Sequence, residues 1–329
     1  MYFETNLKVV IANKLLKTVV AIRTKNESAH VGSECELEVP INCRIQYLDG
    51  RNTVLTDYPS VLFNVGDPIN ITASYTGYPT VQVFSGFVAD FDYGMPMKIR
   101  CADWIYPLNQ GTITISKYNG SLKNLLIQVL KGTGVTLMLP VFDLTLVNIT
   151  FRLMSPAAIL EYLKKEIGLN ISLQGSQLYV NVASNTLGSV IYRTDRNIIK
   201  ANLQKNNTLF ENYRVKCWFI QDNGTKTSIE VGNTTGRMRE QWFYHIPNNP
   251  ATYQKLATEA LNKIKQQMYT GHVETYLYPD CQLFDIAHFK SIRYPDQNAD
   301  YVITGNDFEI NKEGWHRKLK YSFINAPND

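Results

Sequence analysis

The chain has 329 residues, with 33 basic and 29 acidic side chains that leave a net charge of +4 at pH 7. This length suits about two domains with a sizeable core, and the 44% apolar content excludes a disordered chain. The charge is too small and too balanced to indicate a dedicated nucleic-acid binder, which usually carries a clustered basic face.

Five cysteines, with no Cys-x-x-Cys pair, exclude a complete disulfide framework and disfavour a zinc site. We interpret them as reduced, half-buried thiols of a cytosolic chain. The N-terminus does not resemble a signal peptide, and no apolar run approaches the ~18 residues that a membrane span needs. We therefore expect no membrane insertion.

Residues 1–110 predict an antiparallel β module. Apolar and polar residues alternate over short runs that turn signals separate, such as Val65-Gly-Asp-Pro68 and Tyr75-Thr-Gly-Tyr-Pro79. Short strands at this spacing are typical of a barrel or a sandwich. The strands expected are Asn6–Ala12, Lys17–Arg23, Cys35–Pro40, Ile69–Tyr75, Val81–Tyr93 and Lys98–Tyr106.

Residues 111–188 predict an α/β insert built from two tandem helix–strand units. Ser121 and Ser155 are suited to cap two helices, and Pro156 suits the first helical position. Gly134 and Gly168 can end these helices in the left-handed conformation, and an apolar strand follows each one. Gln177–Val182 is expected to close the insert as a strand.

Residues 189–329 predict a second β module that contains one long helix at about 250–269. Asn249 caps that helix, Pro250 opens it, and Gly271 stops it. Its apolar stripe contains Leu256, Ala260, Leu261, Ile264 and Met268. The strands expected are Ser189–Tyr192, Tyr213–Ile220, Thr227–Val231, His272–Tyr278, Tyr301–Thr304 and the hairpin Asn306–Phe323.

The two β regions end alike. Val83–Phe91, a glycine turn and Lys98–Cys101 resemble Tyr301–Ile310, a glycine turn and Arg317–Tyr321. We infer an α+β, mostly β fold with two similar antiparallel β-barrel modules that flank the insert. The alternative is that any two long hairpins look this similar.

No group of residues predicts a catalytic, cofactor-binding or metal site. The five histidines, His30, His245, His272, His288 and His316, lack metal-ligand spacing. Asp90 and Asp92 have the chemistry of a glycosidase pair, but alternate positions on a strand favour a solvated face. The aromatic-rich strands can form a stacking platform for sugars or bases, although core packing explains them more simply.

The basic residues near the C-terminus can contact phosphate, or form a solubilising edge. Alternation places His316, Lys318 and Lys320 on one strand face, with Trp315, Arg317 and Leu319 on the other. Lys312 completes this cluster.

The order of these elements resembles bacteriophage tail baseplate hub proteins of the late-control-protein-D-like and myophage central hub kinds. It is also similar to the N-terminal part of type VI secretion spike proteins. The matching motifs are Gly66-Asp67, Phe84-Ser-Gly-Phe-Val88, Cys101-Ala-Asp-Trp104, Ser121–Val135, Ser155–Leu169, Gln177–Val180, Ala251–Met268, Pro279–Asp285 and Tyr301–Phe323. Phe284 departs from the family, because it replaces the glycine before Asp285 and the second Gly-Asp turn should then be rebuilt.

The resemblance implies a structural, non-enzymatic protein of a phage virion, prophage or contractile injection system, made in the host bacterial cytoplasm. A homotrimer with two similar barrels per subunit would give a pseudo-sixfold ring that caps the tail tube and connects it to the central spike. DNA would pass through its channel without sequence-specific binding. Two other functions stay open: a tail-associated cell-wall or polysaccharide hydrolase, and a carbohydrate-binding tail adhesin.

Overall fold

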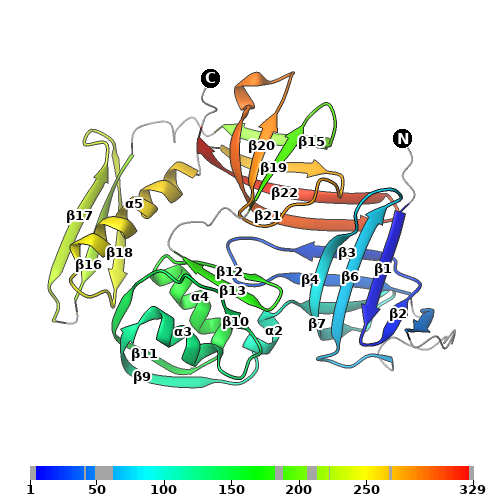
Figure 1. The fold of residues 1–329 in the computed structure, drawn as a ribbon, viewed down its shortest axis with the longest axis horizontal. Coiled ribbons are helices and arrows are strands. Elements are labelled where there is room, and N and C mark those ends of the chain that lie inside the picture. Colours follow the sequence, from blue (N-terminus) through cyan, green and yellow to red (C-terminus); the bar gives the residue numbers. More distant parts are fainter. Residues whose placement is uncertain are drawn as a thin grey trace.

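The computed structural model describes residues 5–40, 42–48, 62–181, 188–205, 213–221, 223–266 and 269–325. The described residues are mostly β, with 53% of them in strands and 15% in helices. One 14-stranded sheet dominates the described residues, and three sheets of two or three strands accompany it (Figure 1). The α+β, mostly β class expected from the sequence is therefore confirmed.

The N-terminal β module forms one half of the large sheet. Its strands lie in the order β3-β4-β8-β7-β6-β1, all neighbours are antiparallel, and two short strands, β2 and β5, extend it beyond β1. The strands are β1 (Thr5–Ile11), β2 (Lys14–Leu16), β3 (Ala21–Lys25), β4 (Glu34–Val39), β5 (Ile45–Tyr47), β6 (Pro68–Tyr75), β7 (Val81–Asp92) and β8 (Met97–Ala102).

The C-terminal β module forms the other half. Its strands lie in the order β15-β19-β22-β21-β20-β14. They are β14 (Ser189–Arg193), β15 (Ile198–Lys205), β19 (Tyr269–Thr275), β20 (Ile286–Lys290), β21 (Ala299–Asn311) and β22 (Gly314–Asn325), and a short 3₁₀ helix, η2 (Pro295–Gln297), precedes β21.

The two modules have the same strand order both in the chain and in space. β1, β3, β4, β6, β7 and β8 correspond in turn to β14, β15, β19, β20, β21 and β22. Five of the six strands also keep the same relative direction; β14 differs, because it pairs with β20 in parallel whereas β1 pairs with β6 antiparallel. The resemblance between the two hairpins in the sequence thus reflects a shared topology.

The registers of the two modules agree residue by residue. β7 carries a bulge between Val88 and Asp90, and β21 carries one between Ile303 and Gly305. When the two modules are aligned at these bulges, buried residues of one module correspond to buried residues of the other. The pairs are Leu37 with Val273, Ile69 with Ala287, Ile71 with Phe289, Val88 with Ile303, Ile99 with Leu319 and Cys101 with Tyr321.

The expected rebuilding of the second Gly-Asp turn is wrong. The N–H of Gly66 donates to the Val88 carbonyl (2.8 Å), and the N–H of Phe284 donates in the same way to the Ile303 carbonyl (2.9 Å). A carboxylate oxygen of Asp285 accepts the N–H of Gln282 at 2.8 Å, which repeats the contact of Asp67 with Asn64 at 2.9 Å. The turn keeps its form although the glycine is absent.

The large sheet follows an open path from β15 to β5, and β3 and β21 join the two modules. Neither module closes into a barrel through strand pairing within the described residues. The modules are therefore two curled halves of one continuous sheet in the part of the chain that the structure describes.

The insert contains the two capped helices that the sequence predicts. The hydroxyls of Ser121 and Ser155 accept the N–H groups of Asn124 and Ala158 at 3.3 and 3.2 Å. The elements are α2 (Ile105–Leu108), β9 (Ile113–Ser121), α3 (Leu122–Leu130), β10 (Thr136–Leu137), β11 (Thr145–Met154), α4 (Pro156–Glu166), β12 (Asn170–Gln174) and β13 (Gln177–Asn181). β13 lies between the strands that follow the two helices.

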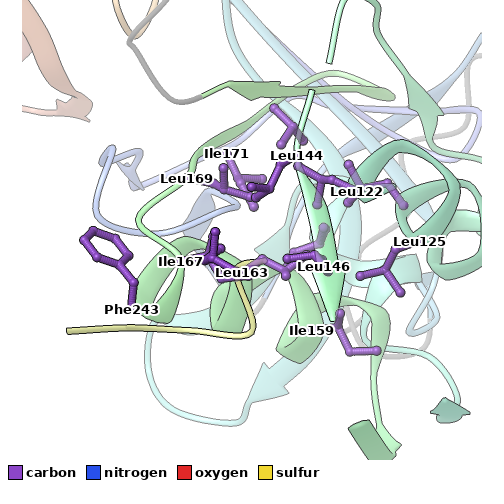
Figure 2. Close-up of a cluster of buried hydrophobic side chains, with 14 of the residues drawn as sticks. Leu122, Leu125, Leu144, Leu146, Ile159, Leu163, Ile167, Leu169, Ile171 and Phe243 are labelled. Carbon is purple, nitrogen blue, oxygen red and sulfur yellow. The ribbon is translucent and has the colours of Figure 1, made fainter. Parts of the chain in front are cut away.

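Residues 213–266 form a small sheet covered by one helix, and they share a core with the insert. The sheet has the order β17-β16-β18, and the elements are β16 (Tyr213–Ile220), β17 (Lys226–Gly232), β18 (Arg237–Tyr244) and α5 (Pro250–Gln266). Phe243 lies beside Ile167 and Leu163 of the insert (Figure 2). α5 confirms the predicted long helix from Pro250 to Gln266, but Tyr269 and the expected stop Gly271 belong to β19. Met268 of its expected stripe lies outside the described residues.

Candidate assembly surface

The junction between the two modules is the clearest candidate for a structural function. At its centre, Ile22 of β3 pairs with Ile310 of β21, and Arg23 pairs with Glu309. Both isoleucines are buried, and Ile310 belongs to the core of the N-terminal module. The long β21–β22 hairpin therefore reaches across and completes the core of its neighbour, which apolar burial stabilises.

Hydrogen bonds extend this junction beyond the two paired residues. The N–H of Phe308 donates to the Thr24 hydroxyl (2.8 Å), the N–H of Asn306 to the Asn26 carbonyl (2.9 Å), and the N–H of Ser28 to the Thr304 carbonyl (2.7 Å). The side of β21 that faces away from β22 is thus paired from Thr304 to Ile310. Such edge pairing satisfies backbone groups that an exposed strand would leave open.

A polar cavity of about 120 Å³ lies where the two modules meet the insert. Ser33 and Asp103 line it from one side, Gln174 from the insert and Asn306 from β21. Two buried atoms of this lining, Asn306 Oδ1 and Gln174 Nε2, have no hydrogen-bond partner among the described residues. The volume and the mixed donors and acceptors suit a small cluster of water molecules. We therefore interpret the cavity as part of the junction where the two modules meet the insert.

Asp103, from the predicted Cys-x-Asp-aromatic motif, fixes the chain beside this cavity. Its carboxylate accepts the N–H groups of Ser33 (2.7 Å) and Ile105 (2.8 Å), and the Ser33 hydroxyl at 2.9 Å. Burial raises the pKa of the Asp103 carboxyl, which the three hydrogen bonds oppose. The motif therefore ties the end of β8 to the loop before β4.

A second exposed surface is the outer face of the small sheet, on the side away from α5. Trp218 and Trp242 stack there, with ring centroids 5.4 Å apart and planes 16° apart, and Trp242 is 40% exposed. The ammonium groups of Lys216 and Lys226 lie over these rings, 4.7 and 5.6 Å from the centroids. Stacked indoles with cations can contact a protein, or a ligand with a flat apolar face.

The basic cluster near the C-terminus does not form one phosphate-binding patch. Arg317 is completely buried and donates to the carboxylate of Asp280 (2.6 Å) and the carbonyl of Pro279 (2.8 Å). Lys320 pairs with Glu27 at 2.6 Å. The alternation expected from the sequence is confirmed, since Arg317 and Leu319 point inward while Lys318 is exposed.

Asp90 and Asp92 lie on a solvated strand face. Both carboxylates approach the same Arg100 guanidinium, at 3.8 and 3.1 Å, and both side chains are at least half exposed. A glycosidase pair needs an enclosed site that separates the roles of its two carboxyls. Asp90 and Arg100 line an open hollow of about 470 Å³, but Asp92 does not, so this hollow does not hold the two carboxyls together.

No group of three or more potential metal ligands occurs in the described part of the chain. Of the five histidines, His288 pairs with Asp300 across β20 and β21 at 2.6 Å. All five cysteines are free and buried. Within residues 5–325, gaps excepted, no helix is both long and apolar enough to cross a membrane.

No protein-family model and no curated protein sequence matches the chain. Solved structures do match it over nearly its full length. A tail protein from Neisseria meningitidis MC58 has a TM-score of 0.68 at 12% identity, with 97% of each chain covered. The 43 kDa tail protein of prophage MuSo2 from Shewanella oneidensis has a TM-score of 0.66 at 13% identity, covering 97% of this chain and 98% of the other.

A third similar structure is a component of the E. coli type VI secretion system, described as similar to the T4 bacteriophage tail proteins gp27 and gp5. It has a TM-score of 0.62 at 8% identity and covers 98% of this chain and 77% of the other. At these identities the likeness concerns the fold. The chain has the fold of these phage tail proteins and of this type VI secretion component.

Proposed function

We propose that this chain is a structural, non-enzymatic subunit of a phage-type tail, and that it acts as a baseplate hub. Three copies form a ring that caps the tail tube, connects it to the central spike and leaves a channel for DNA. The DNA passes without sequence-specific contacts, and the protein needs no cofactor or metal. It is made in the host bacterial cytoplasm and resides in the virion, or in a related prophage or injection-system particle.

The observation that carries this proposal is the repeated module. Two units with one strand order, one bulge position and matching buried residues lie edge to edge within a single chain. Three chains then present six similar units, so a threefold ring can contact both a sixfold tube and a threefold spike. Ring assembly also covers strand edges, which soluble proteins seldom leave exposed.

The chain divides, in this proposal, into a first barrel-like module (1–110), the α/β insert (111–188) and a second barrel-like module (189–329). The small sheet and α5 belong to the third part by sequence, yet they pack on the insert. We infer that the modules form the ring, while the insert and the small sheet project from it toward other tail proteins.

The mass of the assembled protein tests the proposal. Light scattering should give three times the chain mass of 37.6 kDa, alone or with the tube and spike proteins, and electron microscopy should show a ring. A permanent interface of this kind buries more than ~2,000 Å² in total. A monomer under all these conditions would contradict the trimer and the hub function with it.

The stacked Trp218–Trp242 pair favours one alternative, a carbohydrate-binding adhesin, because sugars pack on exposed indoles. Glycan binding that Trp242→Ala abolishes, while light scattering still gives a monomer, would favour the adhesin over the hub. The hydrolase alternative has no such support, since Asp90 and Asp92 lie in the open beside Arg100.

A further inference from the structure

The internal junction has two counterparts that have no partner among the described residues of the single chain. β3 lies between β4 and β21, whereas its counterpart β15 pairs only with β19 in the described residues. The ladders β3-β4-β8 and β15-β19-β22 align Ile22 with Ala201 and Arg23 with Asn202. The free side of β15 is therefore equivalent to the side of β3 that contacts β21.

The second counterpart is the end of β7. β21 pairs with β20 on its first half and with the β3 segment from Thr304 onward, on the same side. β7 pairs with β6 on its first half only, up to Phe87. Beyond Val88, no described residue hydrogen-bonds to this side of the β7 backbone, so Ala89–Tyr93 form an open edge equivalent to Thr304–Phe308.

Exposed apolar side chains mark both open edges. Asp92 and Asp307 are equivalent, because each pairs with a lysine of the return strand. The residues that follow them, Tyr93 and Phe308, are therefore equivalent as well. Phe308 is 4% exposed inside the internal junction, whereas Tyr93 is 74% exposed. Met95, next to it, is 85% exposed, and Ile199 of β15 is 40% exposed. Large apolar groups gathered at a free edge indicate a contact site.

We propose that β15 of one copy pairs, antiparallel, with the Ala89–Tyr93 edge of the next copy, and so repeats between chains the junction that β3 and β21 form within one. Leu203 then lies opposite Tyr93, as Thr24 lies opposite Phe308, and Asn202 lies opposite Gly94. This inference rests on the proposed function, and it names the surface that closes the ring.

The contact is head-to-tail, because each copy offers β15 to one neighbour and the β7 edge to the other. Contacts of this type close into a ring when the rotation per copy divides a full turn. The β7–β8 hairpin turns after Asp92, whereas the β21–β22 ladder continues to Asn311. The contact between chains is thus shorter at the hairpin tip, and Tyr93 and Met95 supply the apolar contacts there.

A cysteine pair tests this register. Tyr93→Cys combined with Leu203→Cys should form a disulfide between copies under mild oxidation, giving covalent dimers and trimers on a non-reducing gel and no larger products. The control is Ile127→Cys with Leu203→Cys; Ile127 is 52% exposed but lies on α3, away from both edges. The native cysteines are buried and should not interfere.

A charged substitution provides a second test that does not depend on disulfide geometry. Tyr93→Asp should weaken association by about tenfold or more, because a carboxylate is then desolvated at the contact. The melting temperature of the dissociated chain should stay unchanged, since Tyr93 is exposed there. The matched control is Tyr294→Asp, which changes a 50% exposed tyrosine outside both edges.

The outcomes separate this inference from the proposed function. A trimer that forms no disulfide in the Tyr93→Cys, Leu203→Cys variant and tolerates Tyr93→Asp would overturn the β15–β7 contact and keep the hub. A chain that remains monomeric at every concentration, alone and with tail proteins, would overturn both. Selective cross-linking together with loss of the trimer in Tyr93→Asp supports both.

Discussion

Phe284 holds in the second module the left-handed backbone position that Gly66 holds in the first, with φ of +70° and +92°. The hydrogen bonds around the two residues are the same, so the turn requires this conformation whichever residue occupies it. A side chain in the left-handed region costs about 1–2 kcal/mol. The buried ring of Phe284, which packs with Leu283 and Val302, offsets that cost.

Substitutions at these two turns should therefore reverse the usual order of glycine and alanine. Phe284→Gly and Phe284→Ala both lose the ring, but only glycine relieves the backbone strain. We expect Phe284→Gly to be more stable than Phe284→Ala by about 1 kcal/mol, and Gly66→Ala to destabilise by about the same amount. Denaturant unfolding measures these differences; an alanine variant at 284 as stable as the glycine variant would contradict the strained turn.

The sequence predicted the three long helices, α3, α4 and α5, and the terminal hairpins, because their signals are local. A serine cap, a proline at the first helical position and a glycine after the last turn lie within one helix, as at Ser155, Pro156 and Gly168. The similarity of the two terminal hairpins was also visible in the sequence. Their residue-by-residue alignment, however, depends on the positions of the two bulges, which the structure shows. Seven strands were missed: β2, β5, β9, β11, β15, β18 and β20.

Four of the missed strands, β9, β11, β15 and β18, lack regular alternation for identifiable reasons. β9 and β11 pair through three register shifts, and Lys117, Asn148 and Leu153 have positive φ, so the apolar residues lose their period of two. β15 and β18 are exposed on much of both faces. The candidate assembly edges could not be predicted from the sequence either, because whether a strand edge is paired depends on the order of strands in the folded sheet. Tyr93 and Met95 resemble ordinary turn residues in the sequence.

Arg317 should be among the side chains least tolerant of change. Its guanidinium is completely buried, bonds to Asp280 and the Pro279 carbonyl, and lies 4.6 Å from the centre of the Phe308 ring. Arg317→Ala removes a hydrogen bond from each of these two groups and leaves a cavity in place of a large buried side chain, so we expect a loss of about 3–5 kcal/mol. Arg317→Lys should recover only part of it, because an ammonium cannot form the same planar contacts.

The exposed Lys318, next to Arg317 on the same strand, is the control for this experiment. Lys318→Ala should change the free energy of unfolding by less than about 0.5 kcal/mol. If chemical denaturation gave similar values for the alanine variants at 317 and 318, the stabilising role assigned to the contacts of Arg317 with Pro279 and Asp280 would be wrong.

Lys164 should make stability depend on pH in the alkaline range. Its ammonium donates to the carbonyls of His30 (2.7 Å) and Ile171 (2.9 Å), and burial lowers its pKa from 10.5 to about 8. Between these two pH values the unfolded chain binds more protons than the folded chain, so this group makes stability rise with pH. Below pH 8 the lysine is charged in both states, and the desolvation cost is fully present.

Lys164→Met removes this dependence. Relative to Lys164→Met, the free energy of unfolding of the natural chain should rise by up to about 3 kcal/mol as the pH increases from 8 to 10.5. Lys165→Met, which changes an exposed neighbour whose side chain is 84% accessible, is the control. Parallel pH profiles for the natural chain and Lys164→Met would show that the ammonium is not desolvated in the folded protein.

Leu256 should be essential to the small sheet and to the insert together. Its side chain is 2% exposed on α5, which packs on β16 and β17 and shares one core with the insert. Leu256→Asp removes a large apolar group and buries a carboxylate without a partner, so we expect a loss of at least about 3–5 kcal/mol. Gln254→Asp places the same charge on the exposed side of that helix and should leave the melting temperature nearly unchanged.

The near-ultraviolet circular dichroism of the stacked Trp218–Trp242 pair reports on this unit, because the pair lies on the opposite face of the sheet that α5 covers. In Leu256→Asp the signal should disappear at a lower temperature than in Gln254→Asp. If the two variants lost it at the same temperature, α5 would not hold the sheet together. If the tryptophan signal disappeared while the rest of the chain stayed folded, the small sheet would be an independent unit and not part of one core with the insert.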